Sequence, residues 1–335
     1  MRFIICLIVI SIFASCTNSD EPNVSDIKVK LEVKRFEKDF FNIDTTQPVN
    51  SISNLQKQYP EFTNEFLYTI LNVDPAWSED TSINYILQFK KAYKNVYDSA
   101  IKVFPNFSKE TKNLEKSIQY LKYYFPKYKA PEKVITYIGP LDGYGDILAE
   151  NAIIVGLHHH LGKNFSLYRS SFVNETYPEY ITSRFEPQYI PINAMKNIIT
   201  DMYPSSFEDQ SLIVQMVEAG KKLYVLSKLV PYVKENELIG YTEKQMNESY
   251  SHEKVIWSLF TQNNLLQNKD INIIKNYIGE SPKTMELGEA SPGNIGSFAG
   301  WLIVKKYVSQ NKSISLTDLM KTGAEDIYVS AKYKP

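Results

Sequence analysis

The sequence predicts an α+β protein in which helices predominate. Residues 27–36 alternate apolar and charged side chains, which is typical of a half-buried strand. Residues 133–141 and 151–159 are short runs rich in β-branched residues and also indicate strands. From residue 187 onward the apolar residues recur mostly at helical spacing. A hydrophobic content of 43% and a charged content of 22% are ordinary for a globular core.

The N-terminal segment predicts export. A charged start is followed by an apolar run over residues 3–13 and by two small residues, which are the parts of a secretory signal. The run is too short to span a bilayer, which needs about 20 residues. Cys16 stands directly after the small residues, as in a bacterial lipobox, although Phe13 occupies a position where leucine is more usual. We expect a lipoprotein signal peptide at 1–15 and a lipid on Cys16; an ordinary cleaved signal is the alternative.

The cysteine count and the charge fit this prediction. The chain has two cysteines, Cys6 and Cys16, and removal of the signal would leave Cys16 alone, so the mature fold would depend on its core rather than on disulfides. The formal net charge is −1, with no basic excess of the kind that nucleic acid requires. The expected partner is therefore a membrane, reached through the lipid on Cys16, and not a nucleic acid.

Residues 16–26 are polar and contain a proline, and we expect them to form a flexible tether. The remaining residues, 27–335, show no internal repeat and no second hydrophobic span, so we expect a single domain there.

In the first half of this domain the spacing predicts a long amphipathic helix over residues 82–104, ended by Pro105. Apolar residues between positions 114 and 125 indicate a second helix, ended by Pro126. Residues 142–146 (DGYGD) have turn chemistry and are expected to connect the two later strands.

In the second half the pattern predicts a helix over residues 211–228. The residues 291–293 (SPG) precede another helical pattern, and a helix reaching residue 260 is expected before it. Two capping boxes are expected to open helices in this half: Thr242 with Gln245, and Ser315 with Asp318.

The histidine run at 158–160 is a candidate metal site. On a strand His158 and His160 would share a face, so two imidazoles could reach one ion while the third points away. No cysteine is near, and we favour a polar strand end before the turn at Gly162 because convergent ligands are lacking. The nearest acidic residues in the sequence are Asp142, Asp146 and Glu150.

Glu218 is a further candidate, as a metal ligand, as a buried hydrogen-bonding group or as an exposed side chain, and exposure is the ordinary state of a glutamate. His252 and Glu253 begin an H-E-x-x-H pattern, but its fifth position is Ile256. The sequence contains no G-x-S-x-G motif, P-loop or dinucleotide fingerprint. We therefore expect no catalytic residue and no cofactor.

A series of segments along the whole chain resembles one family, the gliding-motility lipoprotein GldB family of Bacteroidetes. The segments are RFEKDFF at 35–41, the Tyr59-Pro60 step, YYFP at 123–126, LIVQMVEAGKKLYVL at 212–226, IGYTEKQ at 239–245, EKVIWSLF at 253–260, SPGNIGSFAGWLIVKKYV at 291–308 and AKYKP at 331–335. Residues 157–162 depart from the family, which more often has an acidic residue and aromatics before this Leu-Gly step.

The resemblance implies a lipid-anchored envelope protein, in the outer membrane, that is associated with gliding motility, with adhesin movement and with secretion. Other envelope gliding and secretion proteins are its implied partners. The acidic segment 19–21 is similar to an export signal that sends some lipoproteins of this phylum to the cell surface, and the sequence leaves the periplasmic and surface faces both open.

The same family is distantly similar to zincin-like peptidases of the peptidase MA type, so the resemblance also implies a degenerate zincin-like architecture. Glu218 lies about where the third zinc ligand of such an enzyme belongs, but residues 193–203 (NAMKNIITDMY) contain no histidine. We expect a pseudo-peptidase that is not an enzyme. An active or divergent metallopeptidase and a surface lipoprotein that binds glycan or peptide are the alternatives.

Overall fold

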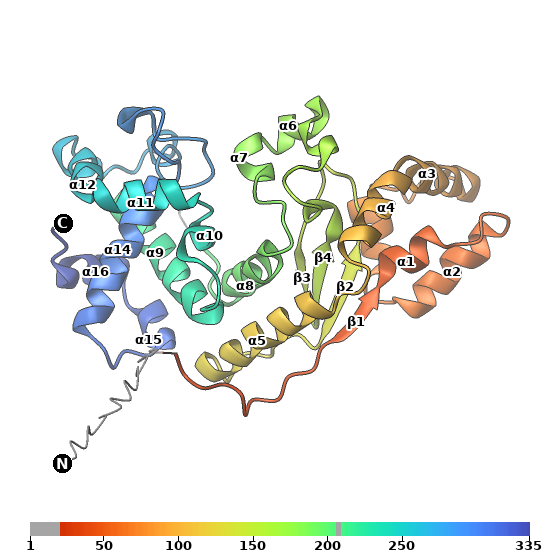
Figure 1. Cartoon of the computed structure of the whole chain (residues 1–335), viewed down its shortest axis with the longest axis horizontal. Helices are drawn as coiled ribbons and strands as arrows, with labels where there is room; N and C mark the ends of the chain where they lie inside the picture. Colours follow the sequence, from red (N-terminus) through yellow and green to blue (C-terminus); the bar gives the residue numbers. More distant parts are fainter. Residues whose placement is uncertain (1–20, 206–208) are drawn as a thin grey trace, which may run out of the picture.

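The structure is a computed structural model that describes residues 21–205 and 209–335. Figure 1 shows a small sheet flanked by the helices of the N-terminal third, and a separate group of helices built from the C-terminal part. Helix α8 (Tyr189–Met202) lies between these two parts. The predicted α+β class with predominant helices is confirmed.

The sheet has four strands in the order β1-β2-β4-β3. Strands β1, β2 and β4 are parallel to one another, and β3 pairs antiparallel with β4 at the edge. Every residue of β4 is buried, which is typical of a strand covered on both faces. The strands span β1 (Glu32–Arg35), β2 (Lys133–Tyr137), β3 (Ile147–Ala149) and β4 (Ala152–Gly156).

The structure corrects the predicted strands in two ways. Only residues 32–35 of the predicted strand at 27–36 pair with a neighbour, and Phe36 already begins a helix. Residues 142–146 do not connect the two predicted strands directly: β2 and β4 are parallel, and a parallel pair needs a longer crossover. The chain instead forms the edge strand β3 and turns back into β4 at residues 150–151.

Helices cover the N-terminal third. The predicted helix at 82–104 is interrupted at Tyr93. Two residues later, the side-chain oxygen of Asn95 accepts the N–H of Val96 at 2.8 Å and so competes with the helical hydrogen bonds. The predicted helix before Pro126 is confirmed and is longer. The elements are α1 (Phe36–Phe41), α2 (Pro48–Gln58), the π-helix η1 (Glu65–Ile70), α3 (Glu79–Ala92), α4 (Lys94–Val103) and α5 (Ser108–Tyr124).

Aromatic rings join these helices to the sheet. The Phe36 ring on α1 lies 4.9 Å from the Phe62 ring and 4.8 Å from the Phe66 ring, both edge to face. Phe62 in turn lies 5.5 Å from Tyr137 of β2. Each such pair adds about 0.5–1.5 kcal/mol beyond area burial, so this cluster fixes α1 and η1 on the sheet.

The rest of the chain is helical apart from its loops. The predicted helix at 211–228 is confirmed as α9, and the Thr242–Gln245 capping box is present in full. The elements are η2 (Leu157–His159), η3 (Ser166–Arg169), α6 (Ser171–Thr176), α7 (Glu179–Thr182), α9 (Leu212–Leu229), α10 (Glu235–Ile239), α11 (Glu243–Ser251), α12 (Glu253–Gln262), α13 (Ile271–Ile274), η4 (Met285–Leu287), α14 (Ile295–Gln310), α15 (Leu316–Lys321) and α16 (Ala324–Ala331).

Two details differ from the expected helices. The helix predicted from Thr242 to residue 260 is divided into α11 and α12 at His252, which is exposed. Ser315 caps α15 by accepting the N–H of Asp318, but the Asp318 carboxylate accepts the hydroxyl of Ser315 and not its backbone N–H. The second capping box is therefore only half formed.

Helices α9 and α14 form the centre of the helical part. Their backbones approach closely at two glycines: a Cβ on Gly300 would overlap the carbonyl of Met216, and a Cβ on Gly220 would overlap the backbone of Gly300. Helix α14 is buried all round over its first ten residues, 295–304, as expected for a helix inside a core.

Residues near the start of the described chain already contact the domain. Val24, in the expected tether, is buried. The carbonyl of Ile27 accepts a hydrogen bond of 2.8 Å from Gln119 of α5. None of the helices in residues 21–205 and 209–335 has the length and apolar character that crossing a membrane requires.

Candidate functional site

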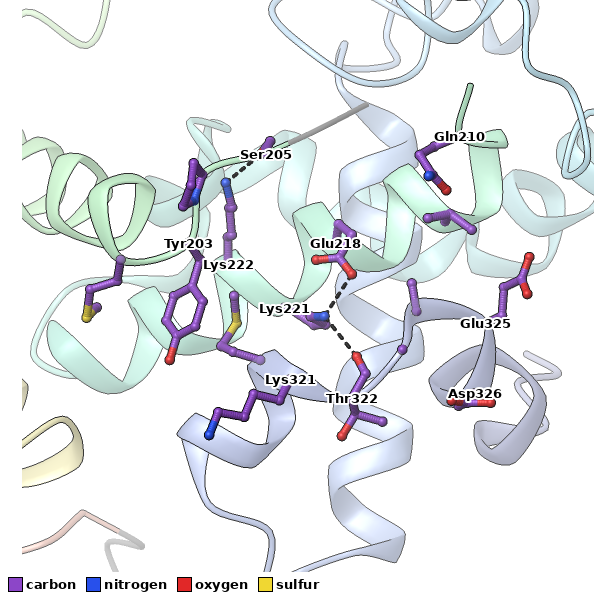
Figure 2. A pocket seen from close by; sticks show the side chains of 16 residues that line it. Tyr203, Ser205, Gln210, Glu218, Lys221, Lys222, Lys321, Thr322, Glu325 and Asp326 are labelled. Atoms are coloured by element: carbon purple, nitrogen blue, oxygen red, sulfur yellow. Dashed lines mark hydrogen bonds and ion pairs between the residues drawn. The ribbon is translucent and has the colours of Figure 1, made fainter. Parts of the chain in front are cut away.

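A cavity of about 700 Å³ contains the candidate residue Glu218 (Figure 2). It lies where the end of α8 and the middle of α9 face the segment that joins α15 to α16. Lysines and acidic side chains both line it, so neither sign of charge dominates. The charged lining residues are Glu218, Lys221, Lys222, Lys321, Glu325 and Asp326.

Glu218 forms an ion pair with a lysine one turn along the same helix. Its Oε1 lies 2.7 Å from Nζ of Lys221, and that ammonium also donates to the carbonyl of Thr322 at 3.0 Å (Figure 2). The Lys221 side chain is 3% exposed, so its charge needs a partner inside the protein. Glu218 therefore compensates a buried cation and helps to hold α9 against the α15–α16 connection.

Lys222 points away from this pair and donates to the hydroxyl of Ser205 (Figure 2). Burial lowers the pKa of Lys222, while the charge of Glu218 acts in the opposite direction. The carboxylate of Glu218 and the carbonyl of Thr322 hold the ammonium of Lys221, and the hydroxyl of Ser205 holds that of Lys222. The two ammonium groups therefore lie at different places in the cavity.

The histidine run lies elsewhere, in and directly after η2 at the end of β4, and its three side chains are buried. The strand prediction for these residues is wrong, because the chain turns into a 3-10 helix after Gly156. Side-chain directions therefore repeat about every three residues here rather than every two. His158 and His160 form hydrogen bonds with different groups.

His158 is a neutral ring held by the β2–β3 connection. Its Nδ1 accepts the N–H of Gly139 at 3.1 Å, and its Nε2 donates to the carbonyl of Tyr144 at 2.9 Å. Burial lowers the pKa of His158 well below its ordinary value, and the neighbouring His159 adds to this. Both ring nitrogens are occupied by the backbone of the same loop.

His159 binds the same loop from another side. Its Nε2 donates to the carbonyl of Leu141 at 3.0 Å, and its ring stacks on Phe185 at 4.2 Å. Burial lowers the pKa of His159 to about 4, so this ring is also neutral near pH 7.

His160 is the charged member of the run. Its Nδ1 faces the carbonyl of Glu186 at 3.0 Å and its Nε2 faces the carboxylate of Asp146 at 2.9 Å, so both ring nitrogens face acceptors. Burial alone would lower the pKa of His160, but the charge and hydrogen bond of Asp146 outweigh it and raise that pKa. The two side chains, 1% and 3% exposed, form a buried ion pair.

Asp146 joins the sheet to α8. Besides His160, its carboxylate accepts the amide of Asn193 at 2.9 Å and the N–H of Gly156 at 3.1 Å, and its carbonyl accepts the amide of Asn197 at 3.0 Å. Burial raises the pKa of Asp146, but His160 and these donors outweigh burial and leave the pKa below its ordinary value.

Sequence reasoning did not find this network. Asn193 and Asn197 are four residues apart, so they share one face of α8. That spacing was visible in the sequence, but nothing there showed that the face meets Asp146, which is far away along the chain.

The three metal candidates are not brought together. His158 and His160 have their ring nitrogens bound to loop and carboxylate groups, and Glu218 binds Lys221 in a different place. Over residues 21–205 and 209–335, no cluster of three or more histidine, cysteine or acidic side chains is arranged to hold a metal ion. The signal peptide at 1–15 and Cys16 lie outside the described residues.

Comparison with known proteins gives one match. A family model described as gliding motility protein GldB matches residues 17–335. No curated protein and no solved structure shows significant similarity to the chain.

Proposed function

Because the chain belongs to the gliding motility protein GldB family, we propose that it is a lipid-anchored, non-enzymatic component of the cell envelope that serves gliding motility, adhesin movement and secretion. The observation that carries this proposal is the extent of the family match, which covers residues 17–335. The lipid is expected on Cys16, directly before the matched region, and an outer-membrane location is part of the proposal.

A non-enzymatic role is supported by how the candidate side chains are used. Glu218 neutralises the buried ammonium of Lys221 at 2.7 Å. His158 has both nitrogens bound to backbone groups, and His160 is held in its charged form by Asp146. A general base or a metal ligand needs a free lone pair, and these contacts occupy or protonate the atoms that would supply one.

We further propose that the fold is a zincin-like scaffold that has lost its chemistry. Zincins place two histidines four residues apart on a helix, as in H-E-x-x-H. On α8 the residues Asn193 and Asn197 have this spacing, but they are amides that donate to Asp146. Zinc binds imidazole, thiolate or carboxylate groups, so these residues do not fit a zinc ion and no step through a metal follows.

The test is complementation of a deletion strain, in the cells that carry this protein, with the wild-type chain and with Glu218→Gln. The glutamine oxygen can still accept from Lys221, but the buried ammonium loses its counter-charge, so thermal unfolding must first show that the variant is folded. We expect Glu218→Gln to restore spreading and adhesin movement to the wild-type rate. Loss of function in a stable, correctly located variant, or metal-dependent proteolysis by the purified chain, would contradict a non-enzymatic role.

One observation favours a second role, the binding of glycan or peptide. A groove of about 420 Å³ beside η1 is lined by Tyr68 and Trp77, which are 44% and 38% exposed. Exposed aromatic rings with polar neighbours are typical of such sites. Saturable binding of a glycan or peptide that is lost in Trp77→Ala, at unchanged stability, would support this role; no binding to either class would remove it.

A further inference from the structure

A second cavity, of about 250 Å³, is lined by residues of α8, α9, α10 and the start of α14. Aliphatic side chains supply most of its exposed wall, and the polar residues are Lys196, Thr200, Lys222, Glu280, Asn294 and Ser297. The aliphatic residues are Ile199, Ala219, Leu223, Leu226, Leu238 and Ile239.

The charges around this cavity are not balanced. Two lysines, Lys196 and Lys222, line it together with a single acidic residue, Glu280, and the ammonium of Lys222 is directed to Ser205 of the first cavity. Glu280 is already engaged by both terminal nitrogens of Arg184, at 2.8 and 3.0 Å. The polar wall therefore carries an excess of positive charge.

Lys196 is the centre of this excess. In the part of the chain that the structure describes, its ammonium has neither a hydrogen bond nor an ion pair, whereas Lys222 donates to the neutral hydroxyl of Ser205. Burial, together with the charge of Arg184 and against a smaller opposite effect of Glu280, lowers the pKa of Lys196 to about 8. The side chain is half-buried and its ammonium has no counter-charge within bonding distance, so an anion placed beside it would be stabilised.

A second donor group lines the same cavity at the start of α14. The side-chain oxygen of Asn294 accepts from Gly279 N at 3.1 Å and from the Ser297 hydroxyl at 2.5 Å, which fixes the orientation of the amide. Its Nδ2 has no acceptor among residues 21–205 and 209–335. Helix α14 is 16 residues long and has no acidic residue in its first turn, where the N–H of Gly296 donates to the carbonyl of Tyr277 at 2.8 Å.

We propose that this cavity binds a small ligand with an anionic head and an aliphatic body. The head would pair with Lys196 and accept from Asn294, while the body would contact the leucine and isoleucine wall. A pocket that is mostly apolar, with few polar groups placed to orient one end of the ligand, is the usual form of a small-molecule site. The inference does not depend on the proposed role in the envelope.

The test measures binding of hexanoate to the purified full chain by calorimetry or ligand-observed NMR. Hexanol supplies the same chain without the charge, and inorganic phosphate supplies a charge without the chain. The variant is Lys196→Met, which keeps the length of the side chain and removes the ammonium. Lys254→Met, at an exposed position of α12, is the matched control. Thermal unfolding of the wild-type chain and of every variant establishes that they are folded.

We expect saturable hexanoate binding to the wild-type chain and to Lys254→Met. In Lys196→Met the affinity should be at least about tenfold weaker. A factor of ten corresponds to about 1.4 kcal/mol, and a hydrogen bond to a charged group is worth about that or more. Lys196→Arg should retain part of the binding. Absence of hexanoate binding, or equal binding by wild-type and Lys196→Met, would overturn the proposal. Equal affinity for hexanol and hexanoate would overturn the anionic head, and equal affinity for phosphate would overturn the aliphatic body.

Discussion

At the scale of single residues, the run His158–His160 shows how a position in the fold decides the chemistry of a side chain. The three rings are consecutive and all buried, but two are neutral and one is charged. The difference follows from their partners: backbone groups surround His158 and His159, whereas a carboxylate faces His160. Together they hold the β2–β3 connection and Asp146 in place.

The buried pair of Asp146 and His160 is expected to be essential for stability. Asp146→Asn should destabilise the protein by about 3–5 kcal/mol, because removing one member of a buried pair leaves the other charge uncompensated. The exposed pair of Lys94 and Asp98 gives the matched control, and Asp98→Asn should change stability by less than about 1 kcal/mol. Chemical denaturation at pH 7 measures both, and equal losses in the two variants would refute the assignment.

The pKa of His159 predicts a dependence of stability on pH. Its folded pKa of about 4 lies below the unfolded value of 6.5, so the unfolded chain binds the proton first and stability is lost as the pH falls. From pH 7 to pH 5 this group alone should cost about 2 kcal/mol.

His159→Gln can still donate to the carbonyl of Leu141 but cannot titrate. We expect its free energy of unfolding to fall by about 2 kcal/mol less than that of the wild type over the same pH interval. Because His160 has a raised pKa, its contribution is present at low pH and opposes this trend in both proteins. The same pH slope in the wild type and in His159→Gln would rule out this explanation.

At the scale of elements, local signals in the sequence located most helices correctly. The apolar period placed α9, and the Thr242–Gln245 pair placed the start of α11. These succeeded because capping and periodicity are local. The division of the helix at Tyr93 was missed because it goes with a local side-chain contact, from Asn95 to the N–H of Val96, that the apolar spacing does not reveal. The edge strand β3 was missed because it has only three residues. The 3-10 turn at 157–159 was missed because its histidines bind groups that are distant in sequence.

The candidate site was only partly predictable for the same reason. Glu218 was identified on a helix with an apolar face, and the structure does place it on α9. Its partner Lys221 was visible one turn away, but its second partner, the carbonyl of Thr322, lies about a hundred positions further on. Asp146 was noted only as a neighbour of the histidines, and its link to Asn193 required the tertiary structure.

The close crossing of α9 and α14 gives a prediction for the helical part. Alanine favours a helix over glycine by about 1 kcal/mol, yet Gly300→Ala should destabilise the protein by more than about 3 kcal/mol or prevent folding. The reason is that the added Cβ would overlap the carbonyl of Met216. Ser309→Ala, at the exposed end of α14, is the control and should have little effect. Wild-type stability of Gly300→Ala in thermal unfolding would show that the helices do not cross so closely.

At the scale of the whole molecule, the described residues form a sheet-containing part and a helical part connected by α8, with Asp146 fastening that helix to the sheet. The chain belongs to the GldB family over residues 17–335. We propose that the protein is a folded domain attached to the envelope through Cys16. It acts by binding other components of the gliding and secretion machinery rather than by catalysis.

The measurement that tests this account most directly is a crosslinking pulldown of the tagged chain from its native envelope, with Cys16→Ala as the control. We expect reproducible recovery of other envelope proteins of the gliding or secretion machinery with the wild-type chain, and a strong reduction with Cys16→Ala. Recovery of no such partner by correctly lipidated, folded protein would contradict the account.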